Sequence, residues 1–187
     1  MEKQNKVLVL GVGRDLTQRL NVSDSAGPTF ADNFHQVVTM DIDPHVKPTY
    51  VCSLDHPWPA TLRQGDFDEV HAYEVLTLVG AGASGFFQVW ANIWDALKPG
   101  GLAFGMTPWW ESVWAWQDPS TKQVYSQEKL NYLSQSYYKE AMTTGYNQSL
   151  WRPPYSFITR ASQQRGANPR TAGFTFVLQK EIYEGQD

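Results

Sequence analysis

Residues 94–108 of the chain are WDALKPGGLAFGMTP, a stretch that contains a helix end, a sharp break and a strand. Upstream of it, apolar side chains recur at helical spacing through residues 84–97, and Ser84 stands where a helix N-cap is expected. Residues 98–101 (KPGG) end that helix because they combine a proline with two glycines. The run GLAFGM, residues 101–106, is then a buried strand. The sequence therefore predicts a helix that leads directly into a core strand.

Further apolar runs on both sides of this unit predict a sheet. The expected strands are residues 7–10, 37–40, a weaker 50–52, 67–75, 101–106, 155–160 and 174–180. A second helix is expected over residues 126–142, beginning at Ser126. Strands that alternate with helices favour an α/β fold with a mainly parallel sheet. The last two strands are joined by residues 163–170, a connection too short for a crossover helix, so they are predicted to form an antiparallel hairpin.

Length, composition and charge narrow the class of protein. The 187 residues are 42% hydrophobic and predict a single domain over residues 1–187. The net charge is -4 without a basic stripe, so nucleic-acid binding is not favoured and stays a minority alternative. Cys52 is the one cysteine and the four histidines lack ligand spacing, so no disulfide and no metal are expected. No apolar run suits a signal peptide or a membrane span, and we expect a cytoplasmic protein of undetermined oligomeric state.

Two glycines and an acid stand at strand ends, where sheets of this kind bind ligands. Gly11 and Gly13 follow the strand at residues 7–10, and Asp41 ends the strand at residues 37–40. Ligands lie outside the carboxyl ends of such strands, because glycines let the backbone approach and an acid accepts hydrogen bonds from ribose hydroxyls. A lone Gly-x-Gly is most often only a turn. Its pairing with Asp41 makes a nucleoside-containing ligand the better interpretation.

The order of several segments resembles the class I S-adenosylmethionine-dependent methyltransferases. These segments are VLVLGVGRD (7–15), VVTMDID (37–43), YVCSLDHPWP (50–59), FDEVHAYEVL (67–76) and WDALKPGGLAFGMTP (94–108). The pair FDEV and LKPGG is the most specific part of the resemblance. It implies a Rossmann-like, doubly wound α/β fold with a mainly parallel seven-stranded sheet, an antiparallel last strand and helices on both faces.

The resemblance also implies roles for particular residues. S-adenosylmethionine is the implied cofactor, with Gly11 and Gly13 beside its methionine part and Asp41 on its ribose hydroxyls. The adenine would lie beside Ser53, Leu54 or Asp55. Tyr73 and Glu74, at the end of the fourth strand, would face the methyl group and the substrate.

Several positions depart from the pattern of the family. Val9 stands where an acid usually holds the amino-acid end of the cofactor, and Asp15 replaces the third glycine of the turn. A frequent Leu-Glu-His is Leu-Thr-Leu at residues 76–78, and a frequent Asp-Pro-Thr-His is Asp-Pro-Ser-Thr at residues 118–121. One hypothesis is that Asp15 takes over the role of the missing acid and binds the amino group of the cofactor.

Methyl transfer from a sulfonium needs alignment and exclusion of water, and it needs a general base only for a nucleophile of high pKa. Glu74 and Asp118 are the candidates for that base. The alternative for Glu74 is a helix-start carboxylate stabilised by the dipole, and for Asp118 a residue of a proline turn. Residues 107–119, TPWWESVWAWQDP, follow the fifth strand, and their tryptophans are expected partly to line a substrate site and partly to pack in the core.

The leading hypothesis is a methyltransferase that acts on a small-molecule or nucleotide-like acceptor. A methyltransferase fold that serves only in binding or as a scaffold is the second hypothesis, favoured by the departures at Val9, Asp15, Thr77 and Thr121. A Rossmann protein that binds NAD is the third, although LKPGG disfavours it. The fourth strand ends in HAYEV, which lacks the Pro-Pro-Tyr type of motif found in enzymes that methylate amines of DNA bases. Cys52 follows Val51 rather than proline, which disfavours cytosine-C5 chemistry.

Overall fold

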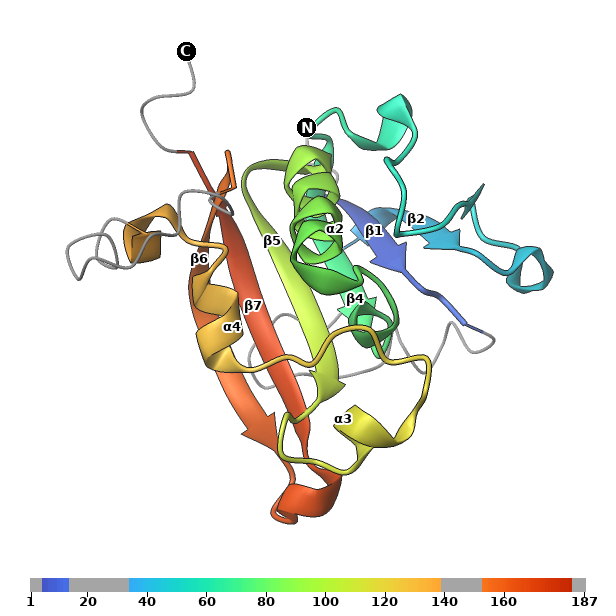
Figure 1. Cartoon of the computed structure of the whole chain (residues 1–187). Helices are drawn as coiled ribbons and strands as arrows, with labels where there is room; N and C mark the ends of the chain where they lie inside the picture. The colour runs from blue at the N-terminus through green and yellow to red at the C-terminus, as the bar shows by residue number, and fades with distance from the viewer. Residues whose placement is uncertain (1–4, 14–33, 139–152, 183–187) are drawn as a thin grey trace.

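The computed structural model describes residues 5–13, 34–138 and 153–182, and these residues form a seven-stranded sheet (Figure 1). The strands are β1 (Asn5–Leu10), β2 (Phe34–Asp41), β3 (Tyr50–Val51), β4 (Phe67–Tyr73), β5 (Leu97–Pro108), β6 (Ser156–Arg165) and β7 (Gly173–Glu181). Their order across the sheet is β3-β2-β1-β4-β5-β7-β6. The first five strands are parallel to one another, whereas β7 runs antiparallel to both β5 and β6. The predicted α/β fold with an antiparallel last strand is confirmed.

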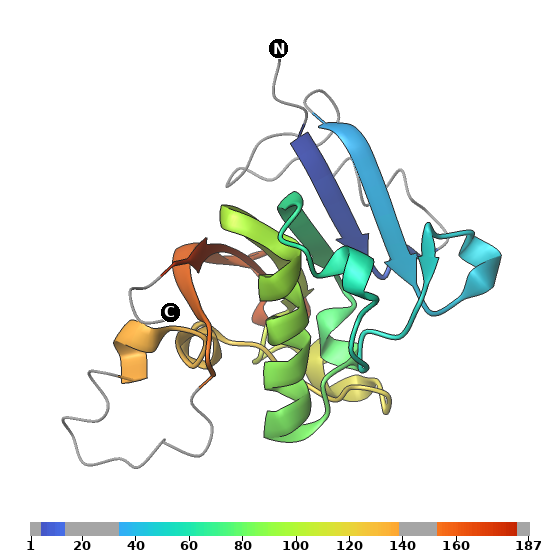
Figure 2. The ribbon, with the colours of Figure 1, turned by 90° about the horizontal axis from the view of Figure 1, so that it is seen from above.

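The helix predicted before β5 is present as α2 (Gly82–Ala96), and it lies across one face of the sheet (Figure 2). It begins two residues earlier than predicted, with Ala81 at the N-cap, so Ser84 is not its cap. At its other end, Lys180 of β7 donates from Nζ to the carbonyl oxygens of Trp94 and Leu97, both at 2.8 Å. These bonds satisfy acceptors that a helix C-terminus leaves without an intrahelical partner.

The second helix, predicted over residues 126–142, is interrupted after Asn131. Helix α4 (Gln127–Asn131) begins after Ser126, whose side chain accepts from the Lys129 amide as predicted for a cap. The chain then turns, and residues 135–138 are helical again; residues 139–142 lie outside the described part. At the turn, the Leu133 carbonyl accepts from the Phe157 amide at 2.9 Å. Beyond the turn, the Gln135 amide donates to Ser156 Oγ at 3.0 Å in place of the Asn131 carbonyl that a continued helix would supply, and local periodicity does not reveal this bond.

Both faces of the sheet are apolar. Helices α2 and α4 pack on one face, where Trp90 meets Phe157 edge-on with ring centroids 5.5 Å apart. On the other face, Val7, Val9 and Tyr73 belong to a separate buried cluster. Burial on both sides explains why β1 is a continuous apolar run rather than an alternating one.

The closing hairpin is confirmed, but its strands are longer than predicted. The pairing of β6 with β7 extends to Arg165 opposite Gly173, with an irregularity between Thr159 and Ala161. The residues added to β6 are polar except for Ala161, and they lie on an edge strand, where backbone hydrogen bonds hold the pair without large apolar side chains. The apolar periodicity that predicted the strand therefore ended before the strand itself.

Short elements connect the strands at the carboxyl edge and elsewhere. They are η1 (Pro44–Val46), η2 (Ala60–Leu62), η3 (Leu76–Leu78), α3 (Trp114–Gln117) and η4 (Pro169–Thr171). Helix α3 lies just beyond the end of β5 (Figure 1). Within the described ranges, no helix is both long and apolar enough to cross a bilayer.

Candidate functional site

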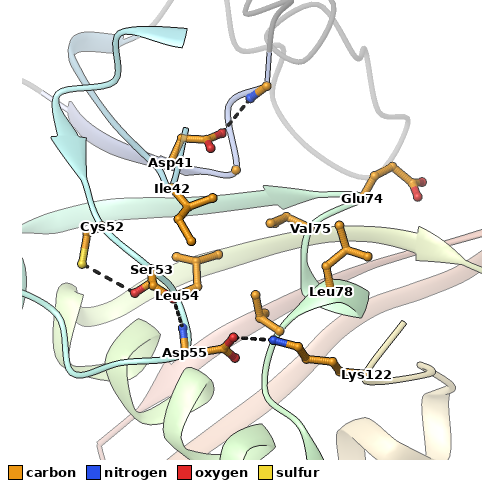
Figure 3. A pocket seen from close by; sticks show the side chains of 13 residues that line it. Asp41, Ile42, Cys52, Ser53, Leu54, Asp55, Glu74, Val75, Leu78 and Lys122 are labelled. Carbon is orange, nitrogen blue, oxygen red and sulfur yellow. Dashed lines mark hydrogen bonds and ion pairs between the residues drawn. The ribbon is translucent and has the colours of Figure 1, made fainter. Parts of the chain in front are cut away.

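A cavity of about 310 Å³ opens at the carboxyl ends of β1, β2 and β4 (Figure 3). We call it the first cavity. It is lined by Gly11, Gly13, Asp41, Ile42, Cys52, Ser53, Leu54, Asp55, Glu74, Val75, Leu78, Val79 and Lys122. Its volume falls in the range of small-molecule sites, and it lies where parallel sheets bind ligands.

Asp41 fixes the glycine turn at one side of the first cavity. Its Oδ2 accepts from the Gly13 amide and its Oδ1 from the Asp43 amide, both at 2.9 Å. The carboxylate therefore joins the turn after β1 to the end of β2. Because each carboxylate oxygen has a second lone pair, Asp41 retains acceptor capacity toward a ligand.

Two features of the structure require glycine at position 11: the backbone conformation and the closeness of Val75. Its φ is +62°, a conformation that side chains rarely adopt. A Cβ atom at this position would lie 2.4 Å from Cγ2 of Val75. The absence of a side chain thus lets the β1 turn close onto the segment that follows β4.

Asp55 lies across the first cavity from Asp41 (Figure 3). Its Oδ1 accepts from the Gly80 amide and its Oδ2 from Lys122 Nζ, both at 2.6 Å. Burial opposes ionisation, but the hydrogen bond from Gly80 and the contact with Lys122 outweigh it and lower the pKa of Asp55. The carboxylate is therefore negative at neutral pH and ties together three separate segments.

Apolar side chains line the first cavity between the two carboxylates. Ile42 follows Asp41 and is 70% exposed, whereas Leu54 is buried beside Asp55. Leu78 belongs to η3 and faces them from the β4 side (Figure 3). This arrangement offers apolar walls to a flat ring, with a hydrogen-bonding group at either end.

A second cavity of about 390 Å³ adjoins the first and shares Glu74 and Leu78 with it. Its other lining residues are Thr77, Pro108, Trp114, Gln117, Asp118 and Thr121. They come from η3, from the end of β5 and from the chain that follows it. The two cavities therefore meet at the residue that follows β4.

The two predicted catalytic residues both line the second cavity. Glu74 has φ +56°, donates its amide to the Met106 carbonyl at 2.8 Å and is exposed. Its side chain points away from Asp41 and Asp55 (Figure 3). Asp118 ends α3, and its Oδ1 accepts from the Ser120 amide and hydroxyl at 2.8 and 2.6 Å. These bonds lower the pKa of Asp118, so it is an ionised turn residue that also faces the cavity.

Two of the residues assigned to the cofactor are not placed at the cavities. Tyr73 is 6% exposed, packs with Val7 and Val9 on the other face of the sheet and shares a 2.7 Å hydrogen bond with His71 Nδ1. The structure does not support its expected position beside the methyl group. Asp15 lies outside the described residues, and its role stays a prediction.

Some lining residues escaped the sequence analysis, and the tryptophans divide as expected. Lys122 reaches the first cavity from a position 67 residues beyond Asp55, a separation with no sequence signal. Trp109 packs against Phe174 with ring centroids 5.5 Å apart, whereas Trp114 is 47% exposed and lines the second cavity. Among the described residues, no group of three or more metal-binding side chains could hold an ion.

Comparison with known proteins places this geometry in a structural class. No protein-family model matches the chain, and no curated protein matches it. Among solved structures, a methyltransferase from Methanosarcina mazei superposes with TM-score 0.60 at 11% identity, covering 98% of this chain and 95% of that one. The N-methyltransferase NodS from Bradyrhizobium japonicum, in complex with S-adenosylhomocysteine, gives TM-score 0.59 at 11% identity and coverages of 95% and 79%.

A third similar structure is the 1,6-didemethyltoxoflavin-N1-methyltransferase of Burkholderia thailandensis with bound 1,6-didemethyltoxoflavin and S-adenosylhomocysteine. Its TM-score is 0.56 at 15% identity, with coverages of 96% and 72%. The chain thus has the Rossmann-like fold of the class I S-adenosylmethionine-dependent methyltransferases, as the resemblance predicted. At these identities the likeness shows the fold alone.

Proposed function

We propose that the protein is an S-adenosylmethionine-dependent methyltransferase that acts on a small-molecule acceptor. The observation that carries the proposal is the junction of two cavities at Glu74 and Leu78. The first cavity would hold the cofactor and the second the acceptor. Similar structures bind S-adenosylhomocysteine, and one of them also binds a small-molecule substrate, which supports both assignments.

The residues of the first cavity fit the adenosyl part of the cofactor. Asp41 has lone pairs left for the ribose hydroxyls, and Ser53, Leu54 and Asp55 would lie beside the adenine between apolar walls. Gly11 and Gly13 line the first cavity, and the methionine part would lie beside them. When bound, this cofactor supplies a methyl group already activated by a sulfonium.

The residues of the chain then have to align the acceptor and manage its proton. Glu74 lies at the junction, where a nucleophile from the second cavity would meet the methyl group. Because its side chain is exposed, a proton taken from the acceptor could pass on to water. Asp118 is ionised and would hold the acceptor from the far side.

Titration calorimetry with S-adenosylmethionine and S-adenosylhomocysteine tests the proposal. We expect both to bind, and we expect Asp41→Ala to weaken binding by at least about tenfold, since it removes charge-assisted hydrogen bonds. Asp43→Ala is the matched control, because Asp43 caps η1 and lies outside both cavities. Circular dichroism of both variants verifies that they fold.

One observation favours the second hypothesis, a methyltransferase fold that binds without catalysis. Val9, at the position of the usual acid, is 1% exposed and sealed in the second apolar cluster. Binding of S-adenosylhomocysteine without methyl transfer to any of a panel of acceptors would support that hypothesis. Binding of neither cofactor form would contradict the proposal, and binding of NAD in their place would support the third hypothesis.

A further inference from the structure

We propose that the second cavity selects an acceptor that carries an amino group on a flat, apolar ring. This inference rests on the proposed function, because it names the class of molecule that would receive the methyl group. It is carried by the charge of the lining, by the exposed tryptophan in the cavity wall and by the position of Glu74.

Both ionisable residues that the structure describes in the lining of the second cavity are acidic. Glu74 and Asp118 are its ionisable lining residues, and no lysine or arginine of the described chain lines it. Lys122, the nearest cation along the sequence, is held 2.6 Å from Asp55 at the first cavity. A concave site with one sign of charge attracts the opposite sign and repels its own. An ammonium group is therefore favoured, whereas the phosphate of a nucleotide-like acceptor is disfavoured.

The wall of the second cavity is aromatic. Trp114 lines it and leaves 47% of its surface exposed, with Pro108 and Leu78 as further apolar lining. An exposed indole face stacks on flat rings and also attracts cations. A molecule that combines a ring with an amine would satisfy Trp114 and the carboxylates together.

Glu74 sets the end of the acceptor that faces the cofactor. Of the residues that the structure describes, it is the one charged residue that lines both cavities, so an amine bound to it lies beside the first cavity. After losing its proton to the Glu74 carboxylate, the amine uses its lone pair to form the nitrogen–carbon bond to the methyl group. The carbon–sulfur bond breaks and its electron pair stays on sulfur, which leaves a neutral thioether. The nitrogen, now methylated and positively charged, remains beside the carboxylates until release.

Two small probes with the same ring and opposite charge test the inference. These are 2-phenylethylamine and 3-phenylpropionate, titrated by ligand-observed NMR into protein saturated with S-adenosylhomocysteine. We expect the amine to bind and the carboxylate to bind at least about tenfold more weakly. Equal binding of the two probes, or tighter binding of the carboxylate, would overturn the inference.

Matched variants locate the binding in the second cavity. Asp118→Asn should weaken the amine about fivefold, as expected for a partly exposed ion pair, and leave S-adenosylhomocysteine affinity unchanged. Asp66→Asn removes a partly exposed carboxylate that pairs with Lys6 outside both cavities, and it should change neither affinity. An Asp118→Asn protein with unchanged amine affinity would place the amine elsewhere and contradict the inference.

A second matched pair tests the aromatic wall. Trp114→Ala should weaken the amine, whereas Trp116→Ala, which removes a tryptophan outside the cavity that is 67% exposed, should not. The affinity for S-adenosylhomocysteine is measured separately in every variant. If the unaltered protein does not bind S-adenosylhomocysteine, the proposed function is contradicted. If it binds S-adenosylhomocysteine but binds the amine and the carboxylate probes equally, only the proposed acceptor class is contradicted.

Discussion

The two cavities lie side by side but are built in different ways. In the first, the carboxylates of Asp41 and Asp55 join segments that are distant in sequence: Asp41 binds a turn 28 residues earlier, and Asp55 binds Gly80 and Lys122. In the second, Asp118 bonds to Ser120, two residues away. These two carboxylates of the first cavity therefore hold distant parts of the fold together, whereas Asp118 stabilises a local turn.

This difference fits the proposed roles of the two cavities, one for the cofactor and one for the acceptor. A cofactor site has to present one fixed geometry, so its ligand-facing groups can belong to the core of the fold. An acceptor site can be altered without loss of the fold when its groups are held locally. Substitutions in the two cavities should then separate stability from specificity.

The largest effect is expected where the first cavity is closest packed. Gly11→Ala would combine an unfavourable φ of +62° with a Cβ only 2.4 Å from Val75 Cγ2. Backbone strain and overpacking together should lower the free energy of unfolding by about 3–4 kcal/mol. The same variant should lose cofactor binding, because the turn is forced away from Val75. Urea denaturation and calorimetry measure the two effects.

Gly82→Ala is the matched control for Gly11→Ala. Gly82 has φ +66°, but nothing lies within 4 Å of the Cβ that the substitution adds. It should therefore cost about 1 kcal/mol, the backbone contribution alone. If the two substitutions lower the free energy of unfolding equally, the close contact between the β1 turn and Val75 does not add to the effect of the backbone conformation.

A smaller effect is expected from the same chemical change made once in each cavity. Asp41→Asn replaces a carboxylate oxygen with an amide nitrogen, which faces the Gly13 or the Asp43 N–H and cannot accept from it. The free energy of unfolding should fall by about 2 kcal/mol, and cofactor affinity should fall with it. Asp118→Asn keeps an acceptor for Ser120 and should leave the urea midpoint unchanged. Equal destabilisation by both changes would contradict the division between the cavities.

The sequence predicted the sheet well because its strands are apolar on both faces. Strand ends then placed Gly11, Gly13 and Asp41 correctly at one edge, as the rule for parallel sheets requires. Tyr73 shows the limit of that reasoning. Adjacent residues of a strand point to opposite faces. Tyr73 enters the buried cluster that contains Val7 and Val9, whereas Glu74, in the turn that follows, lines both cavities.

The parts that the sequence did not reveal depend on contacts distant along the chain. Lys122 reaches Asp55 because the loop after α3 donates two amides, those of Lys122 and Gln123, to the Thr77 carbonyl. The break after α4 depends on a bond between Leu133 and Phe157. Neither interaction leaves a local pattern of spacing or periodicity, since each joins segments that meet only in the folded state.

A carboxyl that lies in neither cavity provides the smallest and most specific test. Glu69 of β4 is 9% exposed, and its Oε2 lies 2.7 Å from His71 Nε2. Burial, and next the charge of Asp68, raise the pKa of Glu69 to about 7. Burial lowers the pKa of His71, so its ring is neutral and does not offset the charge on Glu69.

This raised pKa makes folding depend on pH in a defined direction. Below the usual glutamate value of 4.5, Glu69 is protonated in both the folded and the unfolded chain. Between 4.5 and about 7, the unfolded chain loses the proton first, so the stability that Glu69 contributes at low pH is lost as pH rises, and it is fully lost above about 7. Glu69→Gln stays neutral and should be more stable than the unaltered protein by on the order of 2 kcal/mol at pH 8, with no gain at pH 4.

Urea denaturation at a series of pH values measures this difference, and Glu128→Gln, on the exposed first turn of α4, controls for the loss of one charge. A gain that grows between pH 4.5 and 7 for Glu69→Gln alone would assign that part of the stability profile to β4. A change in cofactor binding near pH 7 that persists in Glu69→Gln would then have a cause other than this carboxyl. If Glu128→Gln shows the same pH-dependent gain, the effect belongs to net charge, and the buried setting of Glu69 does not cause it.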